Sequence, residues 1–169
     1  MRSLKIVSLD RPDPKLYFGP EDAGYLDWDN LLWRFAAEKS YWLTTSDTEG
    51  KPHAMPVWGI WLDAGFWFST YPHSKKAKNL KANPQANVHL GDTEALLVLE
   101  CSAHEVTETA AQQQFVDEYN PKYNWQFTPA DVAGGLFTLT PHTAFAWAAG
   151  EGEKFHNTAT RWRFEVESG

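Results

Sequence analysis

The sequence has one cysteine, a deficit of basic residues and no long apolar run, and each shortage excludes a class of protein. Cys101 is the single cysteine among 169 residues, so no internal disulfide can form, which fits a reducing compartment. Because Cys101 lies in the apolar run LLVLECSA, we expect a buried structural thiol rather than a nucleophile. The net charge of −7 argues against non-specific binding of nucleic acid. No run of about 18 apolar residues and no signal-peptide pattern occurs, so we expect a cytoplasmic protein without a membrane partner.

The motifs of common catalytic sites are also missing. None of the six histidines lies in a metalloprotease-type helix motif, and no group of Cys and His has the spacing of a zinc site, so no metal site is predicted. The sequence has no nucleophile elbow, no P-loop and no dinucleotide-binding glycine pattern, and its carboxylates are scattered. We therefore predict no catalytic side chain. If the protein is an enzyme, a cofactor carries the chemistry.

Aromatic residues, in contrast, are abundant. They make up 15% of the chain and include 9 Trp. Such a composition favours flat surfaces against which ring systems pack, or a large dimer interface.

The hydrophobic pattern predicts one mainly β domain over residues 1–169, of the α+β type with short flanking helices. We expect six or seven strands to form an antiparallel barrel, closed or half-closed. Residues 1–26 are expected to be an N-terminal arm that packs late or crosses to a partner. The predicted helices are 27–38, 108–119, 128–131 and a short one after Ser74, with an aromatic loop at 121–125. Strands are expected at 41–45, 52–62, 66–70, 86–90, 95–106, 136–140, 143–148 and 158–166.

The stretch 65–84, GFWFSTYPHSKKAKNLKANP, predicts a strand, a polar turn and a short helix. Ser74 is a favourable N-cap, and Asn83 with Pro84 ends the helix. Lys75 and Lys76 would then lie in the first turn, where the helix dipole disfavours a cation by about 0.3–1 kcal/mol.

No Asp or Glu occurs between Gly65 and Gly91 to offset these lysines. A bound phosphate would remove the conflict, because free N–H groups, hydroxyls and ammonium groups together form an anion site. A solvated lysine face on a surface helix explains the same residues, and the local sequence does not choose between the two.

The block 41–90 resembles the flavin-binding split β-barrel family that includes pyridoxamine 5′-phosphate oxidase. The stretch 65–84 is similar to the family segment GF-x-F-x-T-x-x-x-S-x-K-x-x-x-L-x-x-NP. This resemblance implies a split barrel that binds FMN between the two subunits of a homodimer.

The resemblance also implies a set of cofactor-binding residues. Residues near the phosphate would come from the end of one strand and the start of the lysine helix, and the second strand would run along the flavin ring. A late aromatic strand of the second subunit would add Trp147, and Arg161 or Arg163 could approach the cofactor or substrate. The full set of cofactor-binding candidates is Ala54, Met55, Pro56, Val57, Trp58, Ser69, Thr70, Ser74, Lys75, Lys76, Asn79, Trp147 and Arg161.

The chain departs from the oxidase of vitamin B6 itself. That enzyme has a basic residue where this chain has Ala54, a lysine near the position of Gly59, and an Arg-x-His motif near its C-terminus. Because these are missing, we do not expect pyridoxamine phosphate to be the substrate. Other relatives bind the deazaflavin coenzyme F-420 in the same groove, and the broad surface at Pro56 and Trp58 would suit its larger tail.

The predicted aromatic loop could cover the open face of the ring and receive a flat substrate, or it could only close one end of the barrel. Its substrate-binding candidates are Tyr119, Lys122, Tyr123 and Trp125.

From these observations we expect a flavoprotein that passes hydride or electrons to a small organic substrate. One alternative is an F-420-dependent reductase of the same fold. A second is a non-catalytic flavin carrier or sensor, for which missing catalytic groups are expected.

Overall fold

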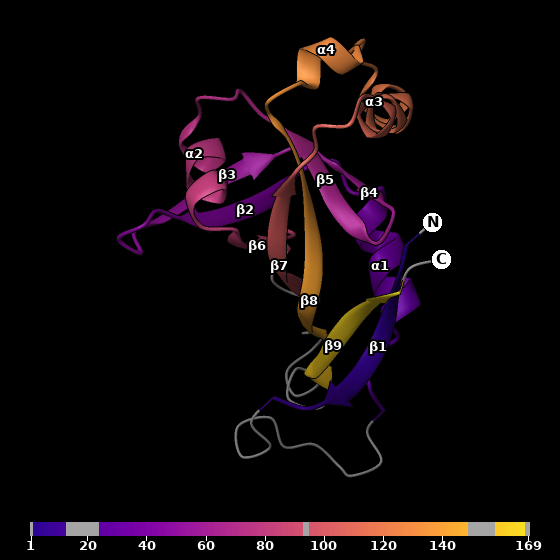
Figure 1. Cartoon of the computed structure of the whole chain (residues 1–169). Helices are drawn as coiled ribbons and strands as arrows, with labels where there is room; N and C mark the ends of the chain where they lie inside the picture. Colours follow the sequence, from indigo (N-terminus) through magenta and orange to yellow (C-terminus); the bar gives the residue numbers. More distant parts are fainter. Residues whose placement is uncertain (1, 13–23, 93–94, 149–157, 168–169) are drawn as a thin grey trace.

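The computed structural model describes residues 2–12, 24–92, 95–148 and 158–167 (Figure 1). Its helices are α1 (Trp28–Ala37), α2 (Lys75–Ala82), α3 (Thr109–Tyr123) and α4 (Pro129–Val132). Its strands are β1 (Ser3–Asp10), β2 (Tyr41–Ser46), β3 (Pro52–Val57), β4 (Ile60–Leu62), β5 (Gly65–Ser69), β6 (Gln85–His89), β7 (Ala95–Glu105), β8 (Leu136–Ala148) and β9 (Thr160–Glu167).

The strands form one antiparallel sheet with the order β1-β9-β8-β7-β6-β2-β3. The sheet branches at β8, which pairs with β7 along most of its length, with β5 through its first half and with β9 through its second half. β1 and β3 are the ends of this order, so the sheet is not closed. In Figure 1, α3 and α4 lie beyond one end of β8, and β9 and β1 lie at the other end. The mainly β split barrel predicted from the sequence is confirmed.

The described residues form nine strands rather than six or seven, and each difference has a local cause. The predicted strand 52–62 is interrupted at Trp58 and Gly59, which separates β3 from β4. The predicted strands 136–140 and 143–148 are one strand, because a bulge beside Pro141 lets β8 pass that residue without ending. β1 was not predicted.

Residues 3–10 of the expected N-terminal arm form β1. These residues pair with β9 of the same chain, with Ser3 opposite Glu167 and Asp10 opposite Arg161. Residues 13–23 of the predicted arm lie outside the described residues.

The predicted loop at 121–125 is also partly wrong. α3 continues through Pro121 to Tyr123, and Asn124 then ends the helix in a left-handed conformation with φ 51°. Pro121 indicated an earlier end to the helix, although Tyr123 continues the four-residue spacing of Phe115 and Tyr119.

Two hydrophobic clusters hold the elements together. The main cluster fills the barrel and includes the fully buried Cys101, as expected, and burial raises the pKa of its thiol. α1 covers this cluster with Trp28 and Phe35, and Asp27 caps the helix by accepting a 2.8 Å hydrogen bond from the N–H of Asn30. The second cluster lies under α3 and contains Ile60, Trp67, Val106, Phe115, Val116, Tyr119, Val132 and Leu136.

Two glycines allow backbone contacts that a side chain would block. At Gly59 a Cβ would lie 2.3 Å from the ring of Phe66. At Gly135 a Cβ would lie 1.9 Å from the carbonyl oxygen of Thr70. The N–H of Thr70 donates a 2.9 Å hydrogen bond to the carbonyl of Gly135, so this contact fixes the end of β5 against the start of β8.

Replacing Gly135 with alanine tests this contact. Because the carbonyl of Thr70 must move away from the new Cβ, we expect the free energy of unfolding to fall by about 1–3 kcal/mol, the usual cost of overpacking. Urea denaturation measures this. Gly24→Ala is the control, since nothing lies within 4 Å of its added Cβ; a change of less than about 0.5 kcal/mol is expected there. Equal stability of both variants would contradict the contact.

Candidate functional site

The start of α2 presents a set of donor groups on the surface. Ser74 is the N-cap as predicted, and its Oγ accepts a 3.2 Å hydrogen bond from the N–H of Ala77. The hydroxyls of Thr70 and Ser74 lie 3.2 Å apart, which places the end of β5 beside the helix. The N–H groups of Lys75 and Lys76 have no acceptor inside the helix, because the first turn of any helix lacks one. Hydroxyls, backbone donors and ammonium groups therefore come together here. Ser69 lies one residue before them, where β5 ends opposite Leu136.

The two first-turn lysines have different surroundings. Lys75 forms a 2.9 Å ion pair with Asp47 in the turn between β2 and β3, and this hydrogen bond holds the pKa of Asp47 below its ordinary value. The dipole conflict predicted for Lys75 is thus reduced by a carboxylate 28 positions away in the sequence. Lys76 is half-buried and has no hydrogen bond or ion pair with any described residue, and burial lowers its pKa.

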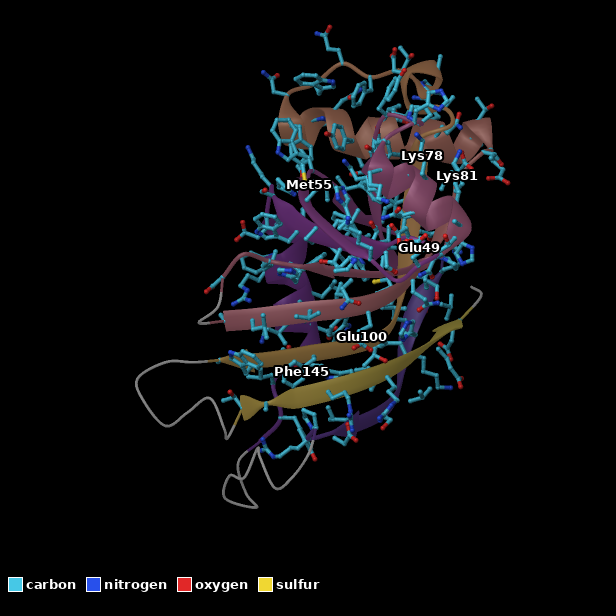
Figure 2. All side chains as sticks on the ribbon, turned by 90° about the vertical axis from the view of Figure 1, so that its left-hand side faces the viewer. Glu49, Met55, Lys78, Lys81, Glu100 and Phe145 are labelled. Atoms are coloured by element: carbon cyan, nitrogen blue, oxygen red, sulfur yellow. The ribbon has the colours of Figure 1, made fainter. Side chains whose placement is uncertain are left out.

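The other two lysines of the helix are less suited to an anion site. Lys81 forms a 2.8 Å ion pair with Glu105. Lys78 is exposed to solvent (Figure 2). Among the lysines of α2, Lys76 is therefore the one that is partly buried and has no ion-pair partner among the described residues.

Asn79 connects α2 to the hairpin of β2 and β3. Its side-chain N–H donates a 3.0 Å hydrogen bond to the hydroxyl of Thr45, and both side chains are buried. The hydroxyl of Thr45 in turn lies 3.5 Å from the carbonyl of His53 in β3. These bonds keep the start of α2 in a fixed position relative to β3.

β3 is an open edge of the sheet. Ala54, Met55 and Pro56 are exposed, and Val57 at its end is buried. Its inner neighbour is β2, and no described strand pairs with its other edge. The backbone groups on that edge are free of strand partners among the described residues.

An exposed aromatic group follows β3. Trp58 stacks on Tyr123 of α3 with ring centroids 5.1 Å apart and an interplanar angle of 4°, and Trp125 meets Trp58 edge-on at 6.4 Å. The indoles of Trp58 and Trp125 are each 49% exposed, whereas Tyr119 is buried.

Lys122 and Tyr123 bind both polar groups of the Gly59 backbone. The hydroxyl of Tyr123 accepts a 3.0 Å hydrogen bond from the N–H of Gly59 and lies 2.8 Å from its carbonyl oxygen. The ammonium of Lys122 donates to the same carbonyl at 3.1 Å, to the carbonyl of Ala36 at 2.8 Å and to the hydroxyl of Tyr41 at 3.1 Å. The ends of α1 and α3 are thereby joined at the interruption between β3 and β4. Burial lowers the pKa of Lys122 to about 8.

Trp147 and Arg161 lie far from this group of residues. One row of cross-strand neighbours crosses the outer face of the sheet from β3 to β1: Pro56, Trp42, His89, Val98, Phe145, Arg161 and Asp10. Since neighbouring strands are about 4.8 Å apart, Arg161 lies about 24 Å from Pro56 along the sheet. Figure 2 shows Met55 and Lys78 toward one end of the molecule and Phe145 toward the other. Arg161 binds Asp10 through two hydrogen bonds of 2.9 and 2.6 Å.

The sequence profile of the family described as pyridoxamine 5′-phosphate oxidase matches residues 30–148, more than half of the chain. The chain belongs to this family. The match covers β3, β5 and α2, and so includes every residue at the start of α2 described above. A search of curated proteins gives no match.

Several solved structures of other proteins share the fold of this protein at low sequence identity. A conserved hypothetical protein of Mycobacterium tuberculosis superposes with a TM-score of 0.66 at 17% identity, covering 78% of this chain and 90% of the other. A protein described as an F-420 reductase gives 0.52 at 21% identity, covering 66% and 94%. HutZ, described as the heme storage protein of Vibrio cholerae, gives 0.52 at 19% identity, covering 69% and 91%.

The described part of this family member contains no group of three or more His, Cys, Asp or Glu that could hold a metal ion. Within the same residues, no helix is long and apolar enough to cross a membrane.

Sequence reasoning missed two residues that shape the site. Nothing in the local pattern indicates the ion pair of Asp47 with Lys75. Tyr41 was read as a strand residue, although its hydroxyl bonds Phe35, Glu38 and Lys122. Local spacing does not carry such long-range contacts. The roles predicted for the substrate-binding and cofactor-binding residues stay predictions.

Lys122→Met tests the junction at Gly59. The folded-state pKa near 8 lies below the ordinary lysine value of 10.5. Between these two pH values the unfolded chain therefore binds the proton more tightly, and the free energy of unfolding due to Lys122 rises with pH. We expect the variant to be less stable at pH 7 by about 1–3 kcal/mol, because it loses hydrogen bonds from a charged donor.

The difference in stability between wild type and Lys122→Met is expected to widen from pH 8 to pH 9.5, as measured by urea denaturation. The exposed Lys78→Met is the control and should show neither effect. A difference that stays constant with pH would contradict the assignment.

Proposed function

We propose that this family member binds FMN, with the phosphate at the start of α2 and the ring along β3, and transfers hydride or electrons to a small organic molecule. The observation that carries the proposal is Lys76, a half-buried ammonium with no partner among the described residues, next to the paired hydroxyls of Thr70 and Ser74. A phosphate there would neutralise the charge of Lys76 and accept hydrogen bonds from the free N–H groups of the first turn.

The ion pair of Lys75 with Asp47 does not oppose this proposal. Both side chains are solvent-accessible, and an exposed pair contributes only about 0–1 kcal/mol. Lys75 can therefore turn toward a phosphate dianion at little cost. Asn79 supports the site indirectly, since its amide is bonded to Thr45.

The ring of the flavin has a suitable surface on β3. The strand leaves one edge of its backbone without a strand partner, and Met55 and Trp58 are 42% and 49% exposed. Open backbone groups can bond the polar edge of the ring, and apolar side chains can lie against its face. When bound, the flavin supplies the redox chemistry. The chain's own part is to hold the phosphate, orient the ring and keep water from one face.

Distance supports a site shared between two copies of the chain. Trp147 is four strands away from β3, about 19 Å along the sheet, and Arg161 about 24 Å. Neither lies on a strand next to β3 of its own chain. If they contact the cofactor, a second copy must present them, so we propose a homodimer packed through the outer face of the sheet. Arg161 would arrive there already oriented by Asp10.

A deazaflavin is the second candidate, because a protein described as an F-420 reductase shares the fold. Its phosphate would use the same lysine, and its longer tail would extend over the surface at Pro56 and Trp58. Tyr123 and Trp125 are the proposed contacts for the substrate, beside Trp58. A carrier or sensor would bind the same cofactor without turnover.

Lys76→Ala is expected to weaken FMN binding about tenfold, since a hydrogen bond between charged groups contributes about 1.5 kcal/mol or more. Lys78→Ala, on the exposed face of the same helix, removes the same charge and should change the affinity less than about twofold. Tryptophan quenching in a titration of the apo-protein measures both. Equal losses would mean that only the overall charge matters and would contradict the site.

The same titration with F-420 and with hemin identifies the preferred cofactor. Steady-state assays with NAD(P)H and dye acceptors then separate an enzyme from a carrier. FMN binding with turnover supports the proposal. Binding without turnover supports the carrier. A preference for F-420 would indicate a reductase that transfers hydride from the deazaflavin.

A further inference from the structure

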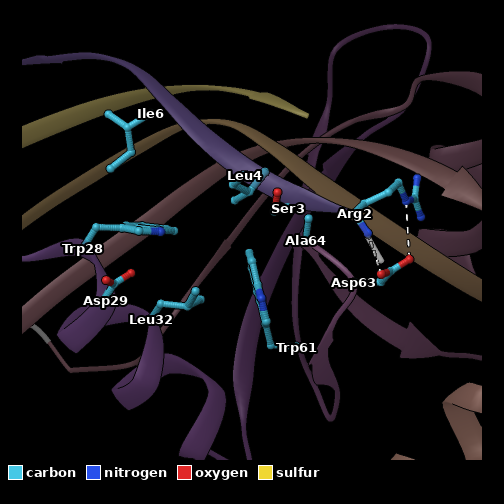
Figure 3. A pocket seen from close by; sticks show the side chains of 10 residues that line it. All are labelled: Arg2, Ser3, Leu4, Ile6, Trp28, Asp29, Leu32, Trp61, Asp63 and Ala64. Carbon is cyan, nitrogen blue, oxygen red and sulfur yellow. Dashed lines mark hydrogen bonds and ion pairs between the residues drawn. The ribbon is translucent and has the colours of Figure 1, made fainter. Parts of the chain in front are cut away.

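A cavity of about 480 Å³ lies away from α2 and β3, between the start of β1, the first turns of α1, and β4 with its turn into β5 (Figure 3). Its volume falls within the range of about 300–1,000 Å³ that is usual for small-molecule sites. Its walls are mostly apolar and consist of Leu4, Ile6, Trp28, Leu32 and Trp61.

The two indoles of the cavity are held in place by the core behind them. Trp28 packs against Trp162 and Phe164, with ring centroids at 5.7 and 4.7 Å. Trp61 meets Phe35 edge-on at 6.1 Å. The aromatic walls are therefore fixed before any ligand arrives, which lowers the entropy cost of binding.

Two carboxylates and one guanidinium line the cavity, so the charges of its lining residues do not cancel. The backbone N–H of Arg2 donates a 2.9 Å hydrogen bond to Asp63, and the Arg2 side chain lies 3.5 Å from the same carboxylate. Asp29 also lines the cavity, and its carboxylate has no hydrogen bond or ion pair with any described residue. In Figure 3, Asp29 lies near Trp28 and Leu32, on the other side of the cavity from Arg2 and Asp63.

The turn that closes the cavity has an unfavourable backbone. Asp63 and Ala64 both have positive φ values, 53° and 66°. For alanine this conformation costs about 1 kcal/mol or more, and glycine would avoid the cost. The methyl group of Ala64 nevertheless lines the cavity and is only 8% exposed. The two-residue turn between β4 and β5 accounts for both values, because such hairpin turns have positive φ at each position.

We infer that this cavity is a second ligand site, separate from the proposed cofactor site, and that it takes a small organic cation with an apolar body. The apolar part lies between Trp28 and Trp61, and the positive group lies at Asp29. The faces of the two indoles attract a cation and do not attract an anion.

Two features of the site oppose a cation: the guanidinium of Arg2, which is paired with Asp63, and the N-terminus of α1. Its dipole corresponds to about half an elementary charge. The hydrogen bond that Asp27 accepts from the N–H of Asn30 already offsets part of this positive charge, and Asp29 carries a full negative charge. The attraction therefore exceeds the repulsion.

Three probes of matched shape and different charge test the inference: phenethylammonium, 2-phenylethanol and phenylacetate. Calorimetric titration into the full chain, with and without saturating FMN, measures their affinities. We expect the cation to bind about fivefold more tightly than the alcohol, from about 1 kcal/mol for one partly exposed ion pair, and the anion to bind weakest. FMN should leave all three affinities unchanged.

Two variants of the same helical turn localise the charge. Asp29→Asn should remove the preference for the cation without changing the affinity of the alcohol. Asp27→Asn removes the same charge from a residue outside the cavity and keeps the cap, since Asn caps as well as Asp; it should retain the preference. Leu32→Trp, which fills the cavity, should abolish binding of the cation and the alcohol, while the melting temperature reports folding.

The inference is overturned if the three probes bind equally, if the two Asn variants behave alike, or if folded Leu32→Trp still binds. Competition between the cation and FMN would also overturn it, because the ligand would then occupy the cofactor site.

Discussion

The backbone pairing of β8 is the constraint on which both ends of the molecule depend. Its first half pairs with β5, and the hydrogen bond from Thr70 to Gly135 extends this pairing toward the start of α2. Its second half pairs with β9 and sets Phe145 opposite Arg161. One strand thus fixes the lysine helix at one end of the sheet and the aromatic and charged outer face at the other. The bulge beside Pro141 allows a single strand to serve both.

The electrostatics of an acidic protein make the start of α2 unusual. Two of its lysines are matched by carboxylates, Lys75 by Asp47 and Lys81 by Glu105. Lys76 is not matched within the described residues, although it is half-buried and burial lowers its pKa. A partly buried charge of this kind is stable only if its cost is offset, and an anionic ligand is the simplest way to offset it. Asp29 is the corresponding anion: its carboxylate lines the aromatic cavity and has no partner among the described residues.

Local sequence was sufficient for the elements whose signals are local. The cap at Ser74 and the end of the helix at Asn83 follow from side-chain chemistry within a few residues. The resemblance of residues 65–84 to the family segment led to the correct fold, which composition alone does not specify. The strand β1 was missed because it is paired with β9 some 150 positions away, and its short apolar patch has no periodic partner nearby. The junction of Lys122 with Gly59, Ala36 and Tyr41 was missed for the same reason.

Parallel titration of the apo-protein with FMN and with riboflavin tests the central claim most directly. The two ligands share the ring and differ only in the phosphate. If the start of α2 binds the phosphate, FMN binds at least about tenfold more tightly at low salt, and Lys76→Ala removes most of this difference. Equal affinities for FMN and riboflavin would show that the phosphate makes no contact and would contradict the account.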